Sequence, residues 1–371
     1  MNIYKAHDIS YRIATKKDEA VLKRLLNKNV MDSWVNITLR KEPNYFDADT
    51  LMGESITVIA HKTEDETAVI GMYACTLFKL FFSGKKESII YLNSLRINPY
   101  FRHKIRFLKE GFNSINKVIS FKATVPFMVT SIASENFNAK RMLESNLKGM
   151  PRYVPLAQMS SFSFLARQNK DPLLSSRANS SDVISMLKFY HSVSRCYDFA
   201  PVLDESWLRT LDGSKGLNIE DFFIVKNPDG EIEAMFALWD QRKIKQVVIE
   251  SYRAPLDRFR SIYNLYAKIS ANLILPKEGD ALQQVFISFF VTLSKDTGWV
   301  LKILKEASSL IAEKNADFCT IGFSSNDPFC TIMRDKLKAK EYKTDIEAVF
   351  LSSATQSEIN ISHLKPEIAL L

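Results

Sequence analysis

Several features are missing from this sequence, and each absence removes a class of protein. No apolar run approaches the roughly 18–20 residues that a membrane-spanning helix requires. The first residues contain no apolar segment followed by a small-residue cleavage site, so we do not expect a secretory signal peptide. The sequence therefore predicts a cytoplasmic protein that has no membrane partner.

Cysteines are few, and their spacing fits neither a disulfide framework nor a metal site. The chain has four of them, and no two form a C-x-x-C pair: Cys75, Cys196, Cys319 and Cys330. Isolated cysteines of this kind are typical of reduced, mostly buried thiols in the cytosol. We therefore expect no disulfide and no metal.

Length and charge are more informative. At 371 residues the chain exceeds the size at which one core keeps growing, so two domains are expected. The net charge of +8 is uneven, since residues 1–166 carry 24 Lys and Arg against 15 Asp and Glu, and the remaining residues carry 26 against 27. A positive field in one half suits a polyanionic ligand, such as coenzyme A, nucleic acid or an acidic membrane surface. No helix-turn-helix, zinc-finger or RNP-like signature is present, so we do not expect nucleic acid as a partner.

One stretch, Ile89–Phe112, carries most of this charge pattern. A continuous apolar run predicts a buried strand, Pro99 predicts a break, and a helix is expected to start near Phe101 or Arg102. The first helical turn would then hold four residues that are basic or can become so: Arg102, His103, Lys104 and Arg106. Cations are unfavourable at a helix N-terminus unless an anion binds there, and the outward N–H groups of a helix start bind phosphate readily. The alternative is a solvated basic face.

These residues resemble the acyl-coenzyme A binding segment of the GNAT acetyltransferase superfamily. The resemblance rests on a strand followed by Leu95-Arg96-Ile97, Pro99 and Phe101-Arg102. In that family a loop of the form Arg/Gln-x-x-Gly-x-Gly/Ala holds the pyrophosphate; here Ile105 and Phe107 stand at the two small positions. The resemblance implies that acetyl-CoA is bound by one set of residues: Leu95, Arg96, Ile97, Arg102, His103, Lys104, Ile105, Arg106 and Asn136.

Two further segments are similar to the same family. The opening Tyr11–Leu26 resembles its first strand and helix, and Ser134–Leu143 carries an Asn, an Ala and an aliphatic residue at the family's spacing. The tyrosine that often serves as general acid would fall on Leu143. The resemblance implies a twisted mixed sheet whose central strands part to admit the pantetheine arm.

The second half repeats the order of elements in the first. Residues 169–182 are rich in Ser, Asp, Asn and Pro, which predicts a linker. The expected division is 1–168, a linker at 169–182, and a second domain at 183–371 that includes a hairpin turning at Asp229-Gly230. The chain thus resembles a bacterial tandem GNAT protein, a mixed α+β fold in which each domain is a twisted mixed sheet flanked by helices.

The second domain is expected to be a degenerate copy that does not bind coenzyme A. Its counterpart of the basic segment, Ser294–Trp299, has one cation, and Asp296 would repel a phosphate. Two other segments, Glu42–Phe46 and Trp239–Arg242, look familiar from uncharacterised tandem members, with no roles to carry over. Trp239–Arg242 either lines a substrate cleft or combines a core tryptophan with a solvated turn.

Transfer of an acyl group to an amine needs close positioning, a route for the ammonium proton, and a donor to the carbonyl oxygen. A backbone N–H of the parted strands could be that donor. The nearest polar candidates are Asn93, Ser94 and Glu135, although Glu135 is better explained as an acid that complements a helix start. No base is assigned.

The function predicted from the sequence is transfer of an acetyl group from acetyl-CoA to an amine, on a small molecule or a peptide, by the first domain. The alternative is a non-catalytic acyl-CoA sensor with a degenerate GNAT fold. A monomer or a homodimer is expected.

Overall fold

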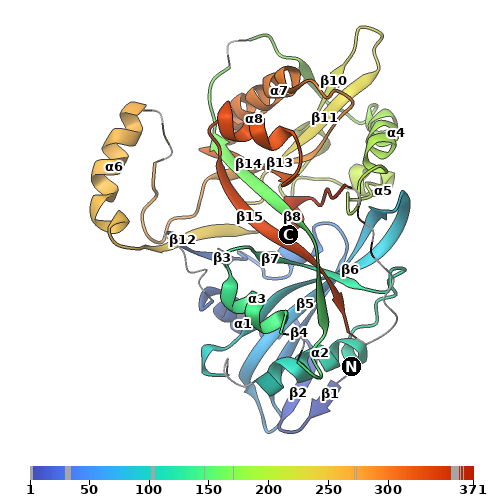
Figure 1. Cartoon of the computed structure of the whole chain (residues 1–371), viewed down its shortest axis with the longest axis vertical. Coiled ribbons are helices and arrows are strands. Elements are labelled where there is room, and N and C mark those ends of the chain that lie inside the picture. Colours follow the sequence, from blue (N-terminus) through green and yellow to red (C-terminus); the bar gives the residue numbers. More distant parts are fainter. Residues whose placement is uncertain are drawn as a thin grey trace.

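The computed structural model describes residues 3–29, 35–101, 105–145, 147–169, 171–270, 272, 274–351, 359, 361 and 363–371. One large mixed sheet runs through the molecule and carries helices on both faces (Figure 1). The predicted mixed α+β fold is thereby confirmed. None of the described helices is long and apolar enough to cross a membrane.

Eight strands lie in the part of the first half that the structure describes, and β6 lies where the apolar run before Pro99 predicted a strand. Its elements are β1 (Ile3–Ala6), β2 (Ile9–Ile13), η1 (Lys16–Asp18), α1 (Glu19–Asn27), β3 (Val35–Arg40), η2 (Asp47–Thr50), β4 (Glu54–Lys62), β5 (Asp65–Phe82), β6 (Lys85–Ile97), η3 (Pro99–Phe101), α2 (Ile105–Val118), β7 (Met128–Ala133), α3 (Phe137–Leu143) and β8 (Arg152–Leu165). The described part of α2 begins at Ile105, after the 3-10 turn that contains Pro99.

The second half repeats this order with added pieces. Its elements are β9 (Ser175–Arg177), α4 (Val183–Ser194), α5 (Glu205–Arg209), η4 (Ile219–Asp221), β10 (Phe222–Lys226), β11 (Ile232–Trp239), β12 (Gln246–Tyr252), α6 (Leu256–Ser270), β13 (Gln284–Thr292), α7 (Thr297–Leu310), η5 (Ile311–Lys314), β14 (Phe318–Ser324), α8 (Phe329–Asp335), β15 (Lys340–Phe350) and η6 (Ile368–Leu370). Strand β9 falls within the expected linker and pairs with β10 at the edge of the sheet.

The order of strands shows an internal two-fold relationship. The sheet runs β1-β2-β4-β5-β6-β7-β15-β8-β14-β13-β11-β10-β9. Strands β6 and β7 are parallel, as are β13 and β14, and each pair is extended by an antiparallel strand from the other half. Strand β15 of the second half pairs with β7, and β8 of the first half pairs with β14 (Figure 1). The two halves therefore exchange a strand and share one continuous sheet.

Helix α2 covers the first half of the sheet because its apolar residues recur every three or four positions. Phe107, Leu108, Phe112, Ile115 and Val118 are buried against the strands. Each such side chain contributes about 1.5–3 kcal/mol when fully buried. The opposite face of the same strands packs against the C-terminal residues, which include Leu364 and Ile368.

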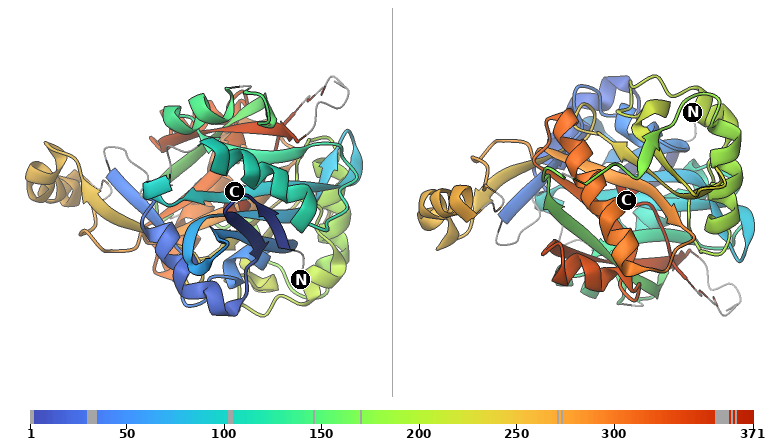
Figure 2. Two further views of the ribbon diagram at one scale, coloured as in Figure 1. Left: turned by 90° about the horizontal axis from the view of Figure 1, so that it is seen from below. Right: turned by 90° about the horizontal axis from the view of Figure 1, so that it is seen from above.

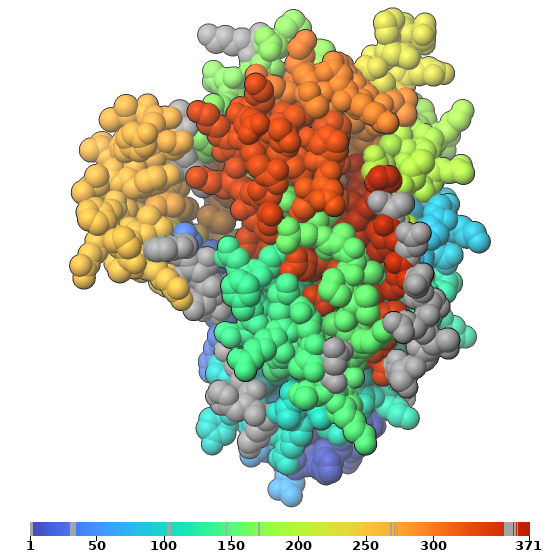
Figure 3. All heavy atoms as spheres, in the orientation of Figure 1, coloured from blue at the N-terminus to red at the C-terminus, as the bar shows by residue number. Residues whose placement is uncertain are grey.

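A separate two-stranded ribbon carries α6 away from the body. Strands β3 and β12 pair with each other and not with the large sheet. Helix α6 follows β12 and stands off the body in the views from below and above (Figure 2). In the space-filling view it forms a lobe of its own (Figure 3).

Candidate functional site

The candidate site begins where β6 parts from β7. Within the described residues these two strands share one backbone pair, Tyr91 with Val129. One position further on, the strands are linked through a side chain, since Thr130 Oγ1 donates to the carbonyl oxygen of Leu92 at 2.8 Å. We call this point the β6–β7 fork. The parting of the central strands agrees with what the family resemblance implied.

A β-bulge in β6 lies next to the fork. Met72 pairs with Arg96 and Ala74 pairs with Asn93, so Ser94 and Leu95 on β6 oppose a single residue of β5. Ser94 adopts a φ of 54°, in the left-handed region that non-glycine residues seldom occupy. Bulges of this kind turn the backbone locally and redirect its polar groups.

A glycine allows the strands to meet at this bulge. An added Cβ on Gly71 would lie 2.7 Å from the carbonyl oxygen of Arg96, closer than any side chain tolerates. Gly71 pairs with Ile97, directly beyond the bulge. The close approach of β5 and β6 beyond the bulge therefore requires a glycine at position 71.

The polar candidates on β6 satisfy one another. Asn93 donates from Nδ2 to Thr76 Oγ1 at 3.1 Å, and Ser94 Oγ donates to Asn93 Oδ1 at 2.9 Å. Arg96 donates from Nη1 to the carbonyl oxygen of Leu95 at 2.9 Å. Neither Asn93 nor Ser94 has a side chain that titrates near neutral pH, so neither is a base.

The two candidates after β7 lie immediately before α3. Glu135 is exposed in the turn that precedes α3. Asn136 caps α3, because its Oδ1 accepts a hydrogen bond from the N–H of Ala139 at 3.2 Å. Leu143, at the position of the family's tyrosine, is a buried core residue. The hydrogen bonding of the Asn136 side chain is thus that of a helix N-cap.

The expected anion-binding segment is partly described. Arg102, His103 and Lys104 lie outside the described residues. Ile105 opens the described part of α2, and Arg106 is exposed there with its guanidinium 3.7 Å from the Asp8 carboxylate. An exposed ion pair at that distance is worth little, so Arg106 can exchange Asp8 for another anion.

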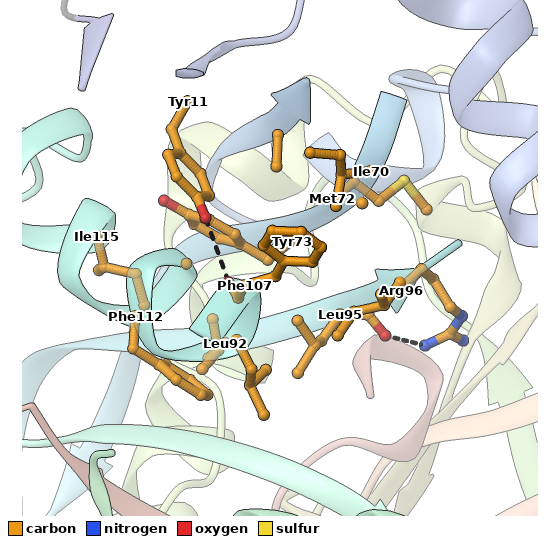
Figure 4. Close-up of a pocket in the computed structure, with 15 residues that line it drawn as sticks. Tyr11, Ile70, Met72, Tyr73, Leu92, Leu95, Arg96, Phe107, Phe112 and Ile115 are labelled. Carbon is orange, nitrogen blue, oxygen red and sulfur yellow. Dashed lines mark hydrogen bonds between the residues drawn. The ribbon is translucent and has the colours of Figure 1, made fainter. Parts of the chain in front are cut away.

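An apolar cavity lies between α2 and the bulge. Leu92, Leu95, Phe107 and Phe112 point into it, and Tyr11 donates its hydroxyl to the carbonyl oxygen of Phe107 (Figure 4). Burial raises the pKa of Tyr11 well above its usual value. The cavity measures about 30 Å³, which is space for roughly two waters.

A second cavity lies on the other face of the sheet. It also measures about 30 Å³, and its lining includes Tyr91, Val129, Glu367, Leu370 and Leu371. Because successive residues of a strand point to opposite faces, Tyr91 and Leu92 place the two cavities on either side of the fork. Residues of α2 line one cavity, and C-terminal residues line the other.

The second half contains an equivalent fork and an equivalent bulge. Strands β13 and β14 pair from Gln284 to Phe286. On β13, Phe289 takes the place of Ser94 in the register and has almost the same φ, 53°. The bulge is therefore a repeated feature of the two halves.

The C-terminal segment 364–371 fills this second fork. The N–H of Phe289 donates to Glu367 Oε2 at 2.8 Å, and Gln241 Nε2 donates to the carbonyl oxygen of Ala369 at 2.9 Å. A Cβ on Gly322 of β14 would lie 2.2 Å from Ile368. Contact this close shows that the segment is packed against the backbone of β14.

Sequence reasoning did not identify a cluster of charged side chains that contains Lys41, Asp49 and Lys245. Lys41 forms an ion pair with Asp49, and its ammonium lies 4.3 Å from the ring centre of Tyr45. Lys245, from the second half, donates to the main-chain oxygen of Leu371 at 3.1 Å. Burial, reinforced by the charge of Lys41, lowers the pKa of Lys245 to about 8.

The sequence held a weak signal for this group. Of the two familiar segments, Glu42–Phe46 adjoins Lys41, and Trp239–Arg242 precedes Lys245. The structure joins them, because Gln246 Nε2 donates to the carbonyl oxygens of both Glu42 and Arg242. Trp239 itself is a buried core residue that donates to the Lys215 carbonyl oxygen at 2.8 Å.

A polar cluster lies under α3. Lys140 Nζ lies 2.6 Å from Asp345 Oδ2, and Ser134 and Gln158 both donate to Asp345 Oδ1. These hydrogen bonds outweigh burial and lower the pKa of Asp345. In contrast, burial and the nearby carboxylate of Glu144 raise the pKa of Glu347 to about 7.

Comparison with solved structures identifies the fold. Saccharomyces cerevisiae N-myristoyltransferase with bound myristoyl-CoA aligns over 94% of this chain and 80% of its own, with 11% identity and a TM-score of 0.60. A second structure of that enzyme with bound myristoyl-CoA aligns over 99% and 90%, with the same identity and TM-score. The chain has a tandem GNAT-type fold. Neither a family model nor a curated protein matches its sequence.

Proposed function

We propose that the protein is an N-acyltransferase that moves an acetyl group from acetyl-CoA to an amine at the β6–β7 fork. The observation that carries this proposal is the contrast between the two forks. The second fork is filled by the chain's own segment 364–371, with the Glu367 carboxylate bound to the N–H of Phe289. The equivalent N–H in the first half belongs to Ser94, whose neighbours Leu92 and Leu95 line one small cavity and whose neighbour Tyr91 lines the other.

The bulge N–H suits the chemistry of acyl transfer. In the second half it binds a carboxylate oxygen that carries negative charge. When an amine attacks a thioester, the carbonyl oxygen gains negative charge and needs a fixed donor. Ser94 N–H would hold that oxygen, since its backbone is constrained by the bulge before the reaction begins.

The surroundings of the fork suit the two substrates. Acetyl-CoA would supply the activated acyl group, and the cations at the start of α2 would hold its phosphates, with Arg106 exposed for that contact. The resemblance to myristoyl-CoA-bound N-myristoyltransferase supports an acyl-CoA donor. The small size of both cavities supports an acetyl group over a long chain. The acceptor amine, on a small molecule or a peptide, would approach from the face that holds the C-terminal segment.

A second candidate function is an acyl-CoA sensor without turnover. It is favoured by the side chains of Asn93 and Ser94, which do not titrate near neutral pH, and by the exposed position of Glu135. Binding and turnover therefore have to be measured separately. We also propose that the two domains span residues 1–168 and 183–371 and that the protein is cytoplasmic.

Calorimetric titration of the full-length protein with acetyl-CoA tests the binding step. Arg106→Ala should weaken the affinity about fivefold, as one exposed phosphate contact is worth about 1 kcal/mol. Lys295→Ala, which removes the cation of the corresponding segment in the second half, is the matched control and should change nothing. Equal losses in both variants, or no binding by the wild type, would refute the assignment to the first half. Thiol release with a panel of amines then separates transferase from sensor.

A further inference from the structure

Helix α6 exposes an apolar stripe that the described part of the chain leaves uncovered. Phe259, Ile262, Leu265, Tyr266 and Ile269 are between 55% and 82% exposed. Their spacing of three and four residues puts them on one side of the helix. A contiguous stripe of large apolar side chains marks an interaction surface, whereas scattered exposed residues do not.

The opposite side of α6 packs against the segment that contains Leu275 and Pro276. Ala267 is fully buried there, Asn264 exchanges two hydrogen bonds of 2.9 Å with the backbone of Leu275, and Arg260 donates to the carbonyl oxygen of Pro276 at 2.7 Å. These contacts fix the rotation of the helix about its axis. The apolar stripe is thereby held outward, on a lobe that projects from the body (Figures 1 and 3).

Charge decides which kind of partner fits the stripe. The sequence of α6 contains three cations and one acid, and the chain as a whole carries +8. A second copy would bring the same positive charge, which opposes association. An amphipathic helix that combines aromatic and aliphatic residues on one side with a net positive charge is typical of segments that lie on anionic lipid.

We propose that α6 docks the protein onto the surface of an anionic lipid bilayer, with its apolar stripe inserted among the lipid headgroups. The ribbon of β3 and β12 holds the helix away from the sheet, so docking leaves the β6–β7 fork uncovered. The sequence led us to expect no membrane partner, because it contains no spanning segment. Docking of this kind needs no spanning segment, only one helix that lies in the plane of the surface.

Flotation with lipid vesicles tests this docking on the full-length protein. The vesicles are either phosphatidylcholine alone or equal parts of phosphatidylcholine and phosphatidylserine. The test variant combines Phe259→Ser, Ile262→Ser and Ile269→Ser, and the matched control combines Leu173→Ser, Ile184→Ser and Leu293→Ser, which are exposed elsewhere. Neither set alters the charge or the core, so circular dichroism should show both folded.

The expected result is specific for lipid and for the stripe. The wild type and the control should float with the anionic vesicles, and the test variant should partition about tenfold less or weaker still. Wild-type protein that floats no better with anionic than with neutral vesicles overturns the proposal. So does light scattering that shows a wild-type dimer and a monomeric test variant, which would assign the stripe to a second copy.

Discussion

Glu347 and Glu144 bring two carboxyl groups together beneath helix α3. Glu347 lies on β15 and is 1% exposed, while Glu144 follows the last residue of the helix. One oxygen of each is buried and accepts no hydrogen bond from a donor in the described part of the chain. Burial and the nearby Glu144 carboxylate disfavour ionisation of Glu347, so Glu347 keeps a proton, shared with Glu144 in a hydrogen bond, until the pH nears 7.

This shared proton makes the stability of the protein depend on pH. The pKa of Glu347 is raised from 4.5 to about 7 in the folded chain, by burial first and by Glu144 second. A raised pKa contributes stability that is complete below about pH 4.5 and is lost as the pH rises through 7. We expect Glu347→Gln to raise the free energy of unfolding at pH 8 by about 2 kcal/mol and to have little effect at pH 4.5.

Urea unfolding at several pH values measures this effect. Asp345→Asn is the control, because the pKa of Asp345 is lowered by its hydrogen bonds. That variant should lose stability at pH 8, the opposite sign. A Glu347→Gln protein less stable than the wild type at pH 8 would contradict the shared proton.

The role assigned to Ser94 rests on its backbone, which leads to a second prediction. Glycine adopts a positive φ without strain, so Ser94→Gly should keep turnover within about threefold of the wild type and should be at least as stable. A β-branched residue cannot adopt φ near 54° without strain, so Ser94→Val should lower turnover by tenfold or more. Thiol release from acetyl-CoA measures both variants. Loss of turnover in Ser94→Gly would instead assign the role to the hydroxyl.

The packing of the C-terminal segment can be tested with a pair of substitutions. Gly322→Ala places a methyl group against Ile368 and should cost about 1–3 kcal/mol of stability. Adding Ile368→Ala makes room for that methyl group, so the double variant should be more stable than the sum of the two single changes predicts. Thermal unfolding measures all three. Additive effects would show that the segment does not contact Gly322.

The small volume of the two cavities predicts which acyl-CoA the protein prefers as acyl donor. Each measures about 30 Å³, space for roughly two waters, which is much closer to the size of an acetyl group than to that of a long acyl chain. A chain of fourteen carbons would have to displace side chains such as Phe107 or Phe112. In competition calorimetry, acetyl-CoA should therefore bind at least as tightly as myristoyl-CoA. Binding of myristoyl-CoA tenfold tighter would show that the cavity opens for a long chain.

Local patterns in the sequence predicted most elements of the fold. The apolar run before Pro99 is β6, and the Asp229-Gly230 turn joins β10 to β11. Each of these depends on periodicity and on turn residues within about fifteen positions. The exchange of β8 and β15 was not predicted, because their patterns fit a strand beside either half equally well.

The site was predicted in part for the same reason. Residues 93–97 are adjacent in the chain, so their gathering at the bulge follows from one strand. Lys41 and Lys245 come from segments that are distant in the sequence, so no pattern within one segment shows that they approach each other. Glu367 likewise reaches the N–H of Phe289 from a distant segment. Asn136 showed the family's spacing, and the structure gives its side chain the local task of capping α3.

The exchange of strands has a consequence for how the protein is made. Strand β7 ends at Ala133, but its antiparallel neighbour β15 is formed by residues 340–350. One edge of β7 therefore stays unpaired until those residues have left the ribosome. The nascent first half therefore exposes an unpaired strand edge during most of synthesis, when such edges pair with wrong partners. Once β15 is inserted, neither half can unfold without breaking the sheet of the other. The whole chain should then melt in a single cooperative transition.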